Sequence, residues 1–201
     1  LYLIDCGEST FKAMFSRNEI YDYDNIVVLL THLHADHIGS LGSFLSFCKN
    51  VLDKKVLLAA EEDTIVNILD QSGVHTDKYN FTTDFKECEA DGLSIYVKRE
   101  SHATDMLCCG FIFECNGENI YYSGDTSNVP SDILNAFLSG EIKTMYQECT
   151  FLDKDSTSHF SLKKLCEIIP YEERQRVYCM HLGDDIDDDI VKAGFRVPKV
   201  V

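Results

Sequence analysis

The feature that most constrains this chain is a cluster of metal-binding residue types in the run Thr31-His32-Leu33-His34-Ala35-Asp36-His37. Three of the seven histidines and one carboxylate fall within six positions. The apolar stretch 25–30 predicts a buried strand before the run, and apolar residues at helical spacing predict a helix over 38–48 after it. In an extended segment the first two histidines point the same way, because side chains alternate with period two. The turn into the helix aims the aspartate and the third histidine at a neighbouring point, so the pattern predicts two adjacent metal ions.

The pattern H-x-H-x-D-H resembles the signature of the metallo-β-lactamase superfamily of hydrolases. The resemblance implies an α/β fold, an αββα sandwich of two mixed β-sheets flanked by helices, with residues 1–201 as one domain. It also implies a further histidine, a bridging aspartate and a last histidine in that order, and each has a match after a predicted strand. The ligand set implied by the resemblance is His32, His34, Asp36, His37, His102, Asp125 and His181.

Three other segments resemble the ribonuclease Z branch of this superfamily. They are Ile4-Asp5-Cys6-Gly7-Glu8-Ser9-Thr10, Ser123-Gly124-Asp125-Thr126, and Glu148-Cys149-Thr150-Phe151 followed by Ser158-His159-Phe160-Ser161. The last pair is similar to an E-x-T-F segment followed by H-S-T, although this chain has His-Phe-Ser. The resemblance implies that His159 lies beside the metals and assists phosphodiester cleavage. It also implies that Asp5, Glu8 and Glu148 hydrogen-bond the metal-binding side chains. A role for Asp5 as a turn residue stays equally open.

The chain departs from ribonucleases Z that process tRNA precursors. Those enzymes carry a long tRNA-gripping arm between the third-motif histidine and the bridging aspartate, whereas His102 and Asp125 are only 23 positions apart. One hairpin fills that interval, and no Lys/Arg-rich segment replaces the arm. The net charge of −16, from 18 basic and 34 acidic residues, opposes a broad nucleic-acid surface. The core without the arm resembles phosphodiesterases of small substrates, including cyclic nucleotides, and we predict that function.

The expected chemistry is hydrolysis by a hydroxide that two divalent metal ions activate. Imidazole-rich ligation with two carboxylates fits zinc best, with manganese and iron as alternatives. Asp36 would orient or deprotonate the nucleophile, and His159 would stabilise the developing charge or protonate the leaving oxygen. An aromatic side chain such as Phe160 could stack on the base. Three alternatives stay open: a ribonuclease Z-like tRNA 3′ endonuclease, an acyl hydrolase of thioesters, lactones or β-lactams, and a binding module that has lost activity.

Length and composition set the remaining expectations. No stretch reaches the roughly 20 apolar residues of a membrane span. The nine cysteines include no C-x-x-C pair, so zinc-ribbon spacing is absent. Most of them stand in apolar segments, which favours buried reduced thiols in a cytoplasmic protein. Leu1 already reads as part of a strand, so we expect residues before it, and a targeting signal there stays open. The resemblance implies that the family's opening strand and glycine-rich turn lie before Leu1. The ribonuclease Z branch commonly forms homodimers, so we expect a homodimer. The molecule that it binds is expected to be a small phosphodiester. A nucleic-acid polymer is less favoured, and no membrane is expected as a partner. Helix 38–47 is a candidate dimer interface, although a role in the core is favoured.

Strands and helices alternate along the chain, as in other α/β proteins. We expect strands over 2–5, 25–30, 56–60, 143–147 and 176–180, and helices over 9–15, 38–48, 61–71, 131–137 and 161–169. Residues 81–99 are expected to be β structure throughout. Residues 108–115 and 118–122 are expected to form a hairpin around the turn Asn116-Gly117.

Overall fold

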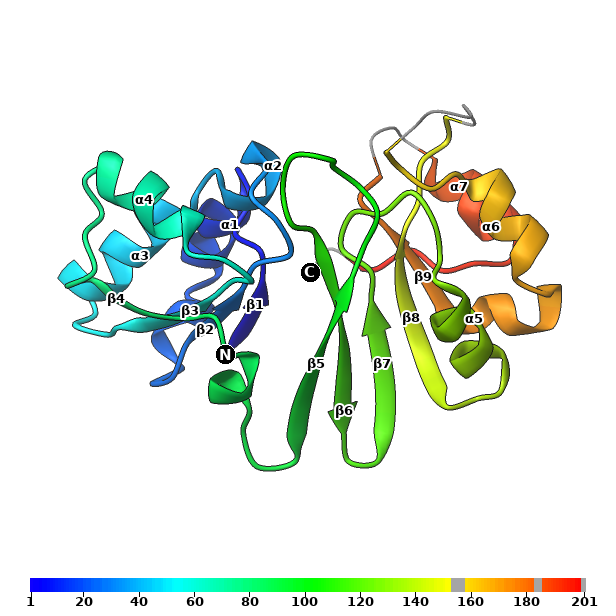
Figure 1. The fold of residues 1–201 in the computed structure, drawn as a ribbon, viewed down its shortest axis with the longest axis horizontal. Helices are drawn as coiled ribbons and strands as arrows, with labels where there is room; N and C mark the ends of the chain where they lie inside the picture. The colour runs from blue at the N-terminus through cyan, green and yellow to red at the C-terminus, as the bar shows by residue number, and fades with distance from the viewer. Residues whose placement is uncertain (153–157, 183–185, 200–201) are drawn as a thin grey trace. The chain divides into compact units, whose positions relative to one another are not determined.

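The computed structural model describes residues 1–152, 158–182 and 186–199, and the chain divides into two compact units, Leu1–Glu89 and Ala90–Val201. Each unit has one β-sheet with helices beside it (Figure 1), so the predicted α/β fold with two helix-flanked sheets is confirmed. None of the helices in the described ranges is long and apolar enough to cross a membrane.

Unit 1 is built around a four-stranded sheet in the order β1-β2-β3-β4, whose three neighbouring pairs are all parallel. The sequence predicts a mixed sheet, but the chain between each pair of these strands contains a helix, and such crossovers produce parallel neighbours (Figure 1). The elements in chain order are β1 (Tyr2–Ile4), α1 (Thr10–Arg17), η1 (Glu19–Tyr21), β2 (Val27–Leu29), α2 (Ala35–Ile38), α3 (Leu41–Asn50), β3 (Val56–Ala59), α4 (Thr64–Gln71), β4 (Tyr79–Thr82) and η2 (Phe85–Cys88).

The core of unit 1 joins the central strands to the helices. All three residues of β2 are buried, as its apolar run predicts for a strand covered on both faces. Helix α3 buries the residues of one stripe at 3–4 spacing, Leu41, Phe44, Leu45 and Cys48, in the same core. This helix therefore has the core role that its apolar pattern favoured over a dimer interface.

Unit 2 contains a five-stranded mixed sheet in the order β5-β6-β7-β8-β9. β5, β6 and β7 are antiparallel neighbours, while β8 is parallel to both β7 and β9. The β6–β7 hairpin turns at Asn116-Gly117, where both residues have positive φ, as predicted. The elements are β5 (Leu93–Arg99), β6 (Cys109–Cys115), β7 (Glu118–Tyr122), α5 (Ser131–Leu138), β8 (Ile142–Glu148), α6 (Leu162–Ile168), η3 (Tyr171–Arg176), β9 (Val177–Met180) and α7 (Asp187–Lys192). The second core lies between this sheet and its helices.

The β structure predicted throughout residues 81–99 is wrong in its middle. The short helix η2 interrupts it, because the side chain of Asp84 accepts a hydrogen bond from the backbone N–H of Lys86 and caps that helix. The two strands on either side, β4 and β5, belong to different units.

Candidate metal centre

Unit 1 holds the metal-binding residue types of the run 31–37, which follows β2 and leads into α2. His32 is buried, and its Nε2 lies 2.9 Å from Nδ1 of His34. His37 is also buried, and its Nε2 lies 3.5 Å from Oδ2 of Asp36. The ring centroids of His32 and His37 are 4.0 Å apart. The three imidazoles and the carboxylate of the run therefore gather at one place in this unit.

Asp5 holds the run from the end of β1. Its Oδ1 accepts the backbone N–H of Thr31 and its Oδ2 accepts the Thr31 hydroxyl, both at 2.8 Å. Oδ2 also accepts Nδ1–H of His37 at 2.7 Å, and Nδ1 of His32 lies 3.0 Å from the Thr31 hydroxyl oxygen. Because a carboxylate only accepts, the proton of the shared bond belongs to His37 Nδ1, which leaves Nε2 as the ligating nitrogen.

The backbone of Asp5 has φ +62°, a left-handed conformation that aspartate tolerates. Asp5 is therefore both a turn residue and a hydrogen-bonding support, and the two interpretations of it do not compete.

The Cys6-Gly7 segment lies directly against the metal-binding run. The N–H of Cys6 donates to the carbonyl oxygen of His37 at 2.8 Å, and the hydroxyl of Ser40 donates to the carbonyl oxygen of Gly7 at 2.5 Å. A Cβ atom on Gly7 would lie 2.0 Å from the carbonyl oxygen of Asp36. Only glycine permits this approach, which explains why the D-C-G segment accompanies the histidine run.

Unit 2 presents its three predicted ligands after the strands β5, β7 and β9. Oδ2 of Asp125, a buried residue, lies 3.6 Å from Nε2 of His102 and 3.4 Å from Nε2 of His181. The backbone is in the left-handed conformation at Gly124 (φ +60°), next to Asp125, and at His181 itself (φ +55°). A single carboxylate oxygen of Asp125 thus faces an imidazole nitrogen of each of these two histidines.

His159 lies beside this aspartate group in unit 2. Its Nδ1 donates to Oε1 of Glu148, a fully buried carboxylate, whose Oε2 accepts the backbone N–H of Thr126. The His159 ring centroid is 4.9 Å from that of His102 and 5.4 Å from that of His181. Glu148 therefore orients His159 and ties down the loop that carries Asp125.

The carbonyl oxygen of Ser158 accepts Nδ1–H of His102 at 2.8 Å. This bond assigns Nε2 as the ligating nitrogen of His102. The Ser-His-Phe-Ser segment therefore supplies His159 and also holds a ligand.

The spacing of the donor atoms in each unit fits a divalent cation. Two ligands at about 2.0–2.2 Å from one tetrahedral zinc ion lie about 3.3–3.6 Å apart. Three donor pairs, His37–Asp36, His102–Asp125 and His181–Asp125, have separations in this range, at 3.5, 3.6 and 3.4 Å. The donor atoms of His32 and His34 are closer, at 2.9 Å. In unit 2, Asp125, Glu148, His159 and His181 each offer a ligand atom within 4.8 Å of the others. The residues present in each unit are thus compatible with the metals that the sequence pattern predicts.

Two sequence-based expectations find no support in these contacts. Glu8 is exposed, and its carboxylate makes no hydrogen bond to a histidine within the described residues, so we do not assign it a supporting role. Phe160 is only 6% exposed and belongs to the hydrophobic core of unit 2, so its ring is not available to stack on a base.

Sequence reasoning missed the groups that orient the ligands through hydrogen bonds. The hydroxyl of Thr31 contacts Asp5 and His32, and the N–H of Thr126 contacts Glu148. A threonine directly beside a metal-binding residue is a signal that could have found both. The role of the Ser158 carbonyl oxygen as a hydrogen-bond acceptor cannot be predicted from the sequence, since every residue type has a backbone carbonyl group.

The chain is similar to named relatives over most of its length. A family model described as "Anti-Pycsar protein Apyc1" matches residues 1–197. The Anti-Pycsar protein Apyc1 of Bacillus phage BSP38 is 28% identical, and the match covers 96% of this chain and 81% of the relative. A ribonuclease Z of Mycolicibacterium paratuberculosis is 24% identical, with 85% of this chain and 67% of the relative covered.

Solved structures share the fold. The metallo-β-lactamase fold protein YhfI from Bacillus subtilis has a TM-score of 0.75 at 20% identity, covering 98% of this chain and 84% of its own. Zinc-bound PqqB from Methylobacterium extorquens has a TM-score of 0.71 at 12% identity, covering 98% and 80%. These likenesses confirm the metallo-β-lactamase fold that the histidine run predicts.

The predicted superfamily, with its ribonuclease Z resemblance, is confirmed by these relatives. The prediction of a metal-dependent phosphodiesterase of cyclic nucleotides agrees with the matched family and fold. The chain belongs to the Anti-Pycsar protein Apyc1 family.

Proposed function

We propose that the predicted ligands bind two divalent metal ions and that this centre hydrolyses a cyclic mononucleotide to a linear nucleotide. These ligands are His32, His34, Asp36, His37, His102, Asp125 and His181. The observation that carries the proposal is the position of Asp125, whose Oδ2 lies 3.4–3.6 Å from an imidazole nitrogen on His181 and on His102. The oriented pair His159 and Glu148 lies beside it. We further propose that residues 1–201 act as one catalytic domain.

Zinc is the metal that we propose for both positions. Five of the seven proposed ligands are imidazoles, a set that suits zinc, and PqqB of the same fold is zinc-bound. Manganese and iron are the alternatives. Elemental analysis of protein purified without added metal would decide among them, and a preparation that holds no first-row metal would contradict the proposal.

The protein side chains would divide the acid and base roles. Bound divalent ions would polarise the phosphodiester and make a hydroxide available near neutral pH. The Asp36 side chain is about half-exposed and would orient the attacking water and accept its proton. His159 has Nδ1 held by Glu148, which leaves Nε2 to donate a proton to the leaving ribose oxygen. The bond from phosphorus to that oxygen breaks as the bond to the water oxygen forms.

The interval between His102 and Asp125 supports a small substrate. It contains β6, β7 and a short connecting segment, which fills it without an arm. Cleavage of a tRNA precursor is the second candidate, and the ribonuclease Z relative is the observation that favours it.

The test is turnover by zinc- or manganese-loaded protein. The panel would contain cyclic purine and pyrimidine nucleotides, bis-p-nitrophenyl phosphate, and a tRNA precursor with a 3′ trailer. We expect rapid cleavage of a cyclic nucleotide and no cut in the tRNA. Clean cleavage of the tRNA precursor would mean that the substrate is tRNA and not a cyclic nucleotide. If no phosphodiester in the panel is hydrolysed, the proposal is rejected.

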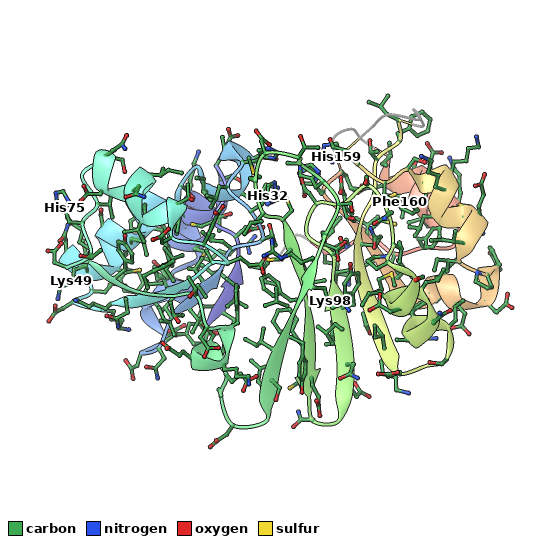
Figure 2. The ribbon with its side chains drawn as sticks, viewed as in Figure 1. His32, Lys49, His75, Lys98, His159 and Phe160 are labelled. Atoms are coloured by element: carbon green, nitrogen blue, oxygen red, sulfur yellow. The ribbon has the colours of Figure 1, made fainter. Side chains whose placement is uncertain are left out.

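Variants separate the roles of individual residues in this test. Asp125→Ala should abolish turnover while the far-ultraviolet circular dichroism stays unchanged. His159→Ala should keep its metal but lose about 10²–10⁴ in kcat. The control is His75→Ala: His75 is exposed, pairs with Asp70, and lies far from His32 in unit 1 (Figure 2). Full turnover by Asp125→Ala would sink the two-metal mechanism.

We also propose that the protein is a cytoplasmic homodimer. All nine cysteines are free thiols, which suits a reducing compartment. The dimer is supported by the resemblance to the ribonuclease Z branch. Size-exclusion chromatography with light scattering would test it, and the mass of a single chain across micromolar concentrations would contradict it.

A further inference from the structure

Glu100 is a partly buried acidic residue that the proposed reaction does not use. It directly follows β5, and its carboxylate is bonded on both oxygens. The hydroxyl of Tyr121 in β7 donates to Oε1 at 2.5 Å, and the hydroxyl of Thr126 donates to Oε2 at 3.0 Å. Both partners are fully buried. The carboxylate thus connects the end of β5 to the strand and to the loop that carry Asp125.

A second set of bonds ties the same two segments together. The backbone N–H of Ser127 donates to the carbonyl oxygen of Ser101 at 2.6 Å, and the Ser127 hydroxyl donates to the same oxygen at 2.7 Å. Residues 100–102 therefore lie alongside residues 125–127 in unit 2. The two proposed ligands in these segments, His102 and Asp125, are held with their donor atoms 3.6 Å apart.

Even partial burial of this carboxylate is costly, and the structure retains it. An apolar residue at the same place would avoid that cost. A carboxylate, however, can accept two hydroxyl protons at once, and an apolar residue cannot hold the Thr126 side chain at all.

We propose that Glu100 is a positioning residue for the metal centre: through the Thr126 hydroxyl it holds the Asp125 loop at a fixed separation from His102. The inference rests on the proposed function, because it assumes that both ligands bind metal. Glu100 itself touches neither metal nor substrate in this scheme and takes no part in proton transfer.

The experiment compares cobalt binding by the metal-free protein with turnover of a cyclic nucleotide. The variants are Glu100→Ala, Glu100→Gln, Thr126→Val, Thr126→Ser and the double variant Glu100→Ala/Thr126→Val. We expect Glu100→Ala and Thr126→Val each to bind Co²⁺ about 10–100-fold more weakly and to change its visible absorption spectrum. Glu100→Gln and Thr126→Ser should recover most of the affinity, because an amide oxygen can still accept and a serine hydroxyl can still donate.

The Thr126 hydroxyl also lies 2.8 Å from the carbonyl oxygen of Asn128, so Thr126→Val removes more than one contact. The double variant isolates the Glu100–Thr126 pair, since coupled residues give losses that do not add. The matched control is Glu114→Ala, because Glu114 accepts a tyrosine hydroxyl, that of Tyr96, in an exposed pair of the same sheet. It should bind cobalt as the wild type does.

Unchanged cobalt affinity and spectrum in Glu100→Ala would overturn the inference, and so would losses that add in the double variant. If Glu100→Ala does not fold, the comparison of Thr126→Val with Thr126→Ser carries the test, and equal affinities in that pair would overturn the inference. A wild-type protein that binds no metal would reject the proposed function and this inference together. A wild-type protein that binds metal normally while the variants match it would reject only the role of Glu100.

Discussion

At the scale of single residues, unit 1 selects the tautomers of its histidines before any metal binds. Asp5 accepts a hydrogen bond from Nδ1–H of His37. The hydroxyl of Thr31 donates to the same Asp5 carboxylate and lies within hydrogen-bond distance of Nδ1 of His32. The nitrogens opposite these bonds are then the ones available to a cation. The hydrogen bonds around the ligands therefore contribute to metal affinity as well as the ligands themselves.

Asp5→Asn tests this network. The asparagine oxygen can still accept the N–H of Thr31, but the amide NH₂ cannot accept Nδ1–H of His37. We expect metal affinity, measured by titration calorimetry with Zn²⁺, to fall about 10–100-fold. Asp70→Asn is the control, because Asp70 forms an exposed aspartate–histidine pair in unit 1, with His75. Equal affinity of Asp5→Asn and wild type would mean that Asp5 is only a turn residue.

Gly7→Ala tests the close approach of two backbones. The added Cβ would lie 2.0 Å from the carbonyl oxygen of Asp36, a backbone atom that cannot rotate away. We expect a loss of about 1–3 kcal/mol in the free energy of unfolding by urea, with weaker metal binding because the run 31–37 is displaced. Gly42→Ala in α3 is the control, since the nearest atom to its Cβ would be a Val74 methyl at 3.3 Å, a side-chain atom. A variant Gly7→Ala as stable as the control would contradict this account.

At the scale of elements, helix α3 buries the thiol of Cys48 completely. Burial raises the pKa of Cys48 from 9 to about 12. Because the folded state holds the proton more tightly than the unfolded chain, the stability from this group is complete below pH 9. It is lost as the pH rises from 9 toward 12.

Alkylation by iodoacetamide measures the protonation state of Cys48. Only the thiolate reacts, so native Cys48 should be unlabelled at pH 8 to 9 when mass spectrometry of tryptic peptides is used. The same residue should react within minutes in urea. Half-exposed Cys115 is the internal reference for reagent activity. Labelling of native Cys48 at the rate of Cys115 would show that α3 does not pack as described.

The elements also show how far the sequence could predict the structure. The apolar runs of β2 and β3 and the 3–4 spacing of α3 were sufficient to predict these elements. Burial of a fixed face of a strand or helix produces a periodic pattern of apolar residues in the sequence. His102, Asp125 and His181 follow strands, as the sequence indicated, and their binding of metal stays a prediction that the resemblance implies. Phe160 was misjudged as a base platform, since a lone aromatic does not reveal which way it points. The contacts of Glu100 with Tyr121 and Thr126 left no pattern, because they join residues distant in sequence.

At the scale of the whole molecule, the chain combines two hydrophobic cores with a strongly negative net charge. Each unit has its own core and its own sheet. The charge balance is the reverse of that usual in a polyanion-binding protein, with 34 acidic residues against 18 basic ones. The net charge therefore repels an anionic substrate, and under the proposed function the bound metal ions would supply its attraction.

The dependence of kcat/KM on salt distinguishes a small phosphodiester from a nucleic acid. Added salt screens repulsion between exposed charges, with a Debye length of about 10 Å at 0.1 M. For a cyclic nucleotide we expect kcat/KM to stay level or rise a few-fold between about 50 and 200 mM NaCl. A protein that holds 6–10 phosphates through basic side chains instead loses about 10³–10⁵ in affinity over that range.

Metal content measured at each salt concentration is the control, because loss of metal would imitate weaker binding. A steep fall in kcat/KM with increasing salt, at constant metal content, would indicate a local polyanion-binding surface despite the net charge of −16. A level or rising profile, by contrast, requires a substrate that makes few contacts with basic side chains. That is the behaviour expected of a phosphodiesterase with no tRNA-gripping arm between His102 and Asp125.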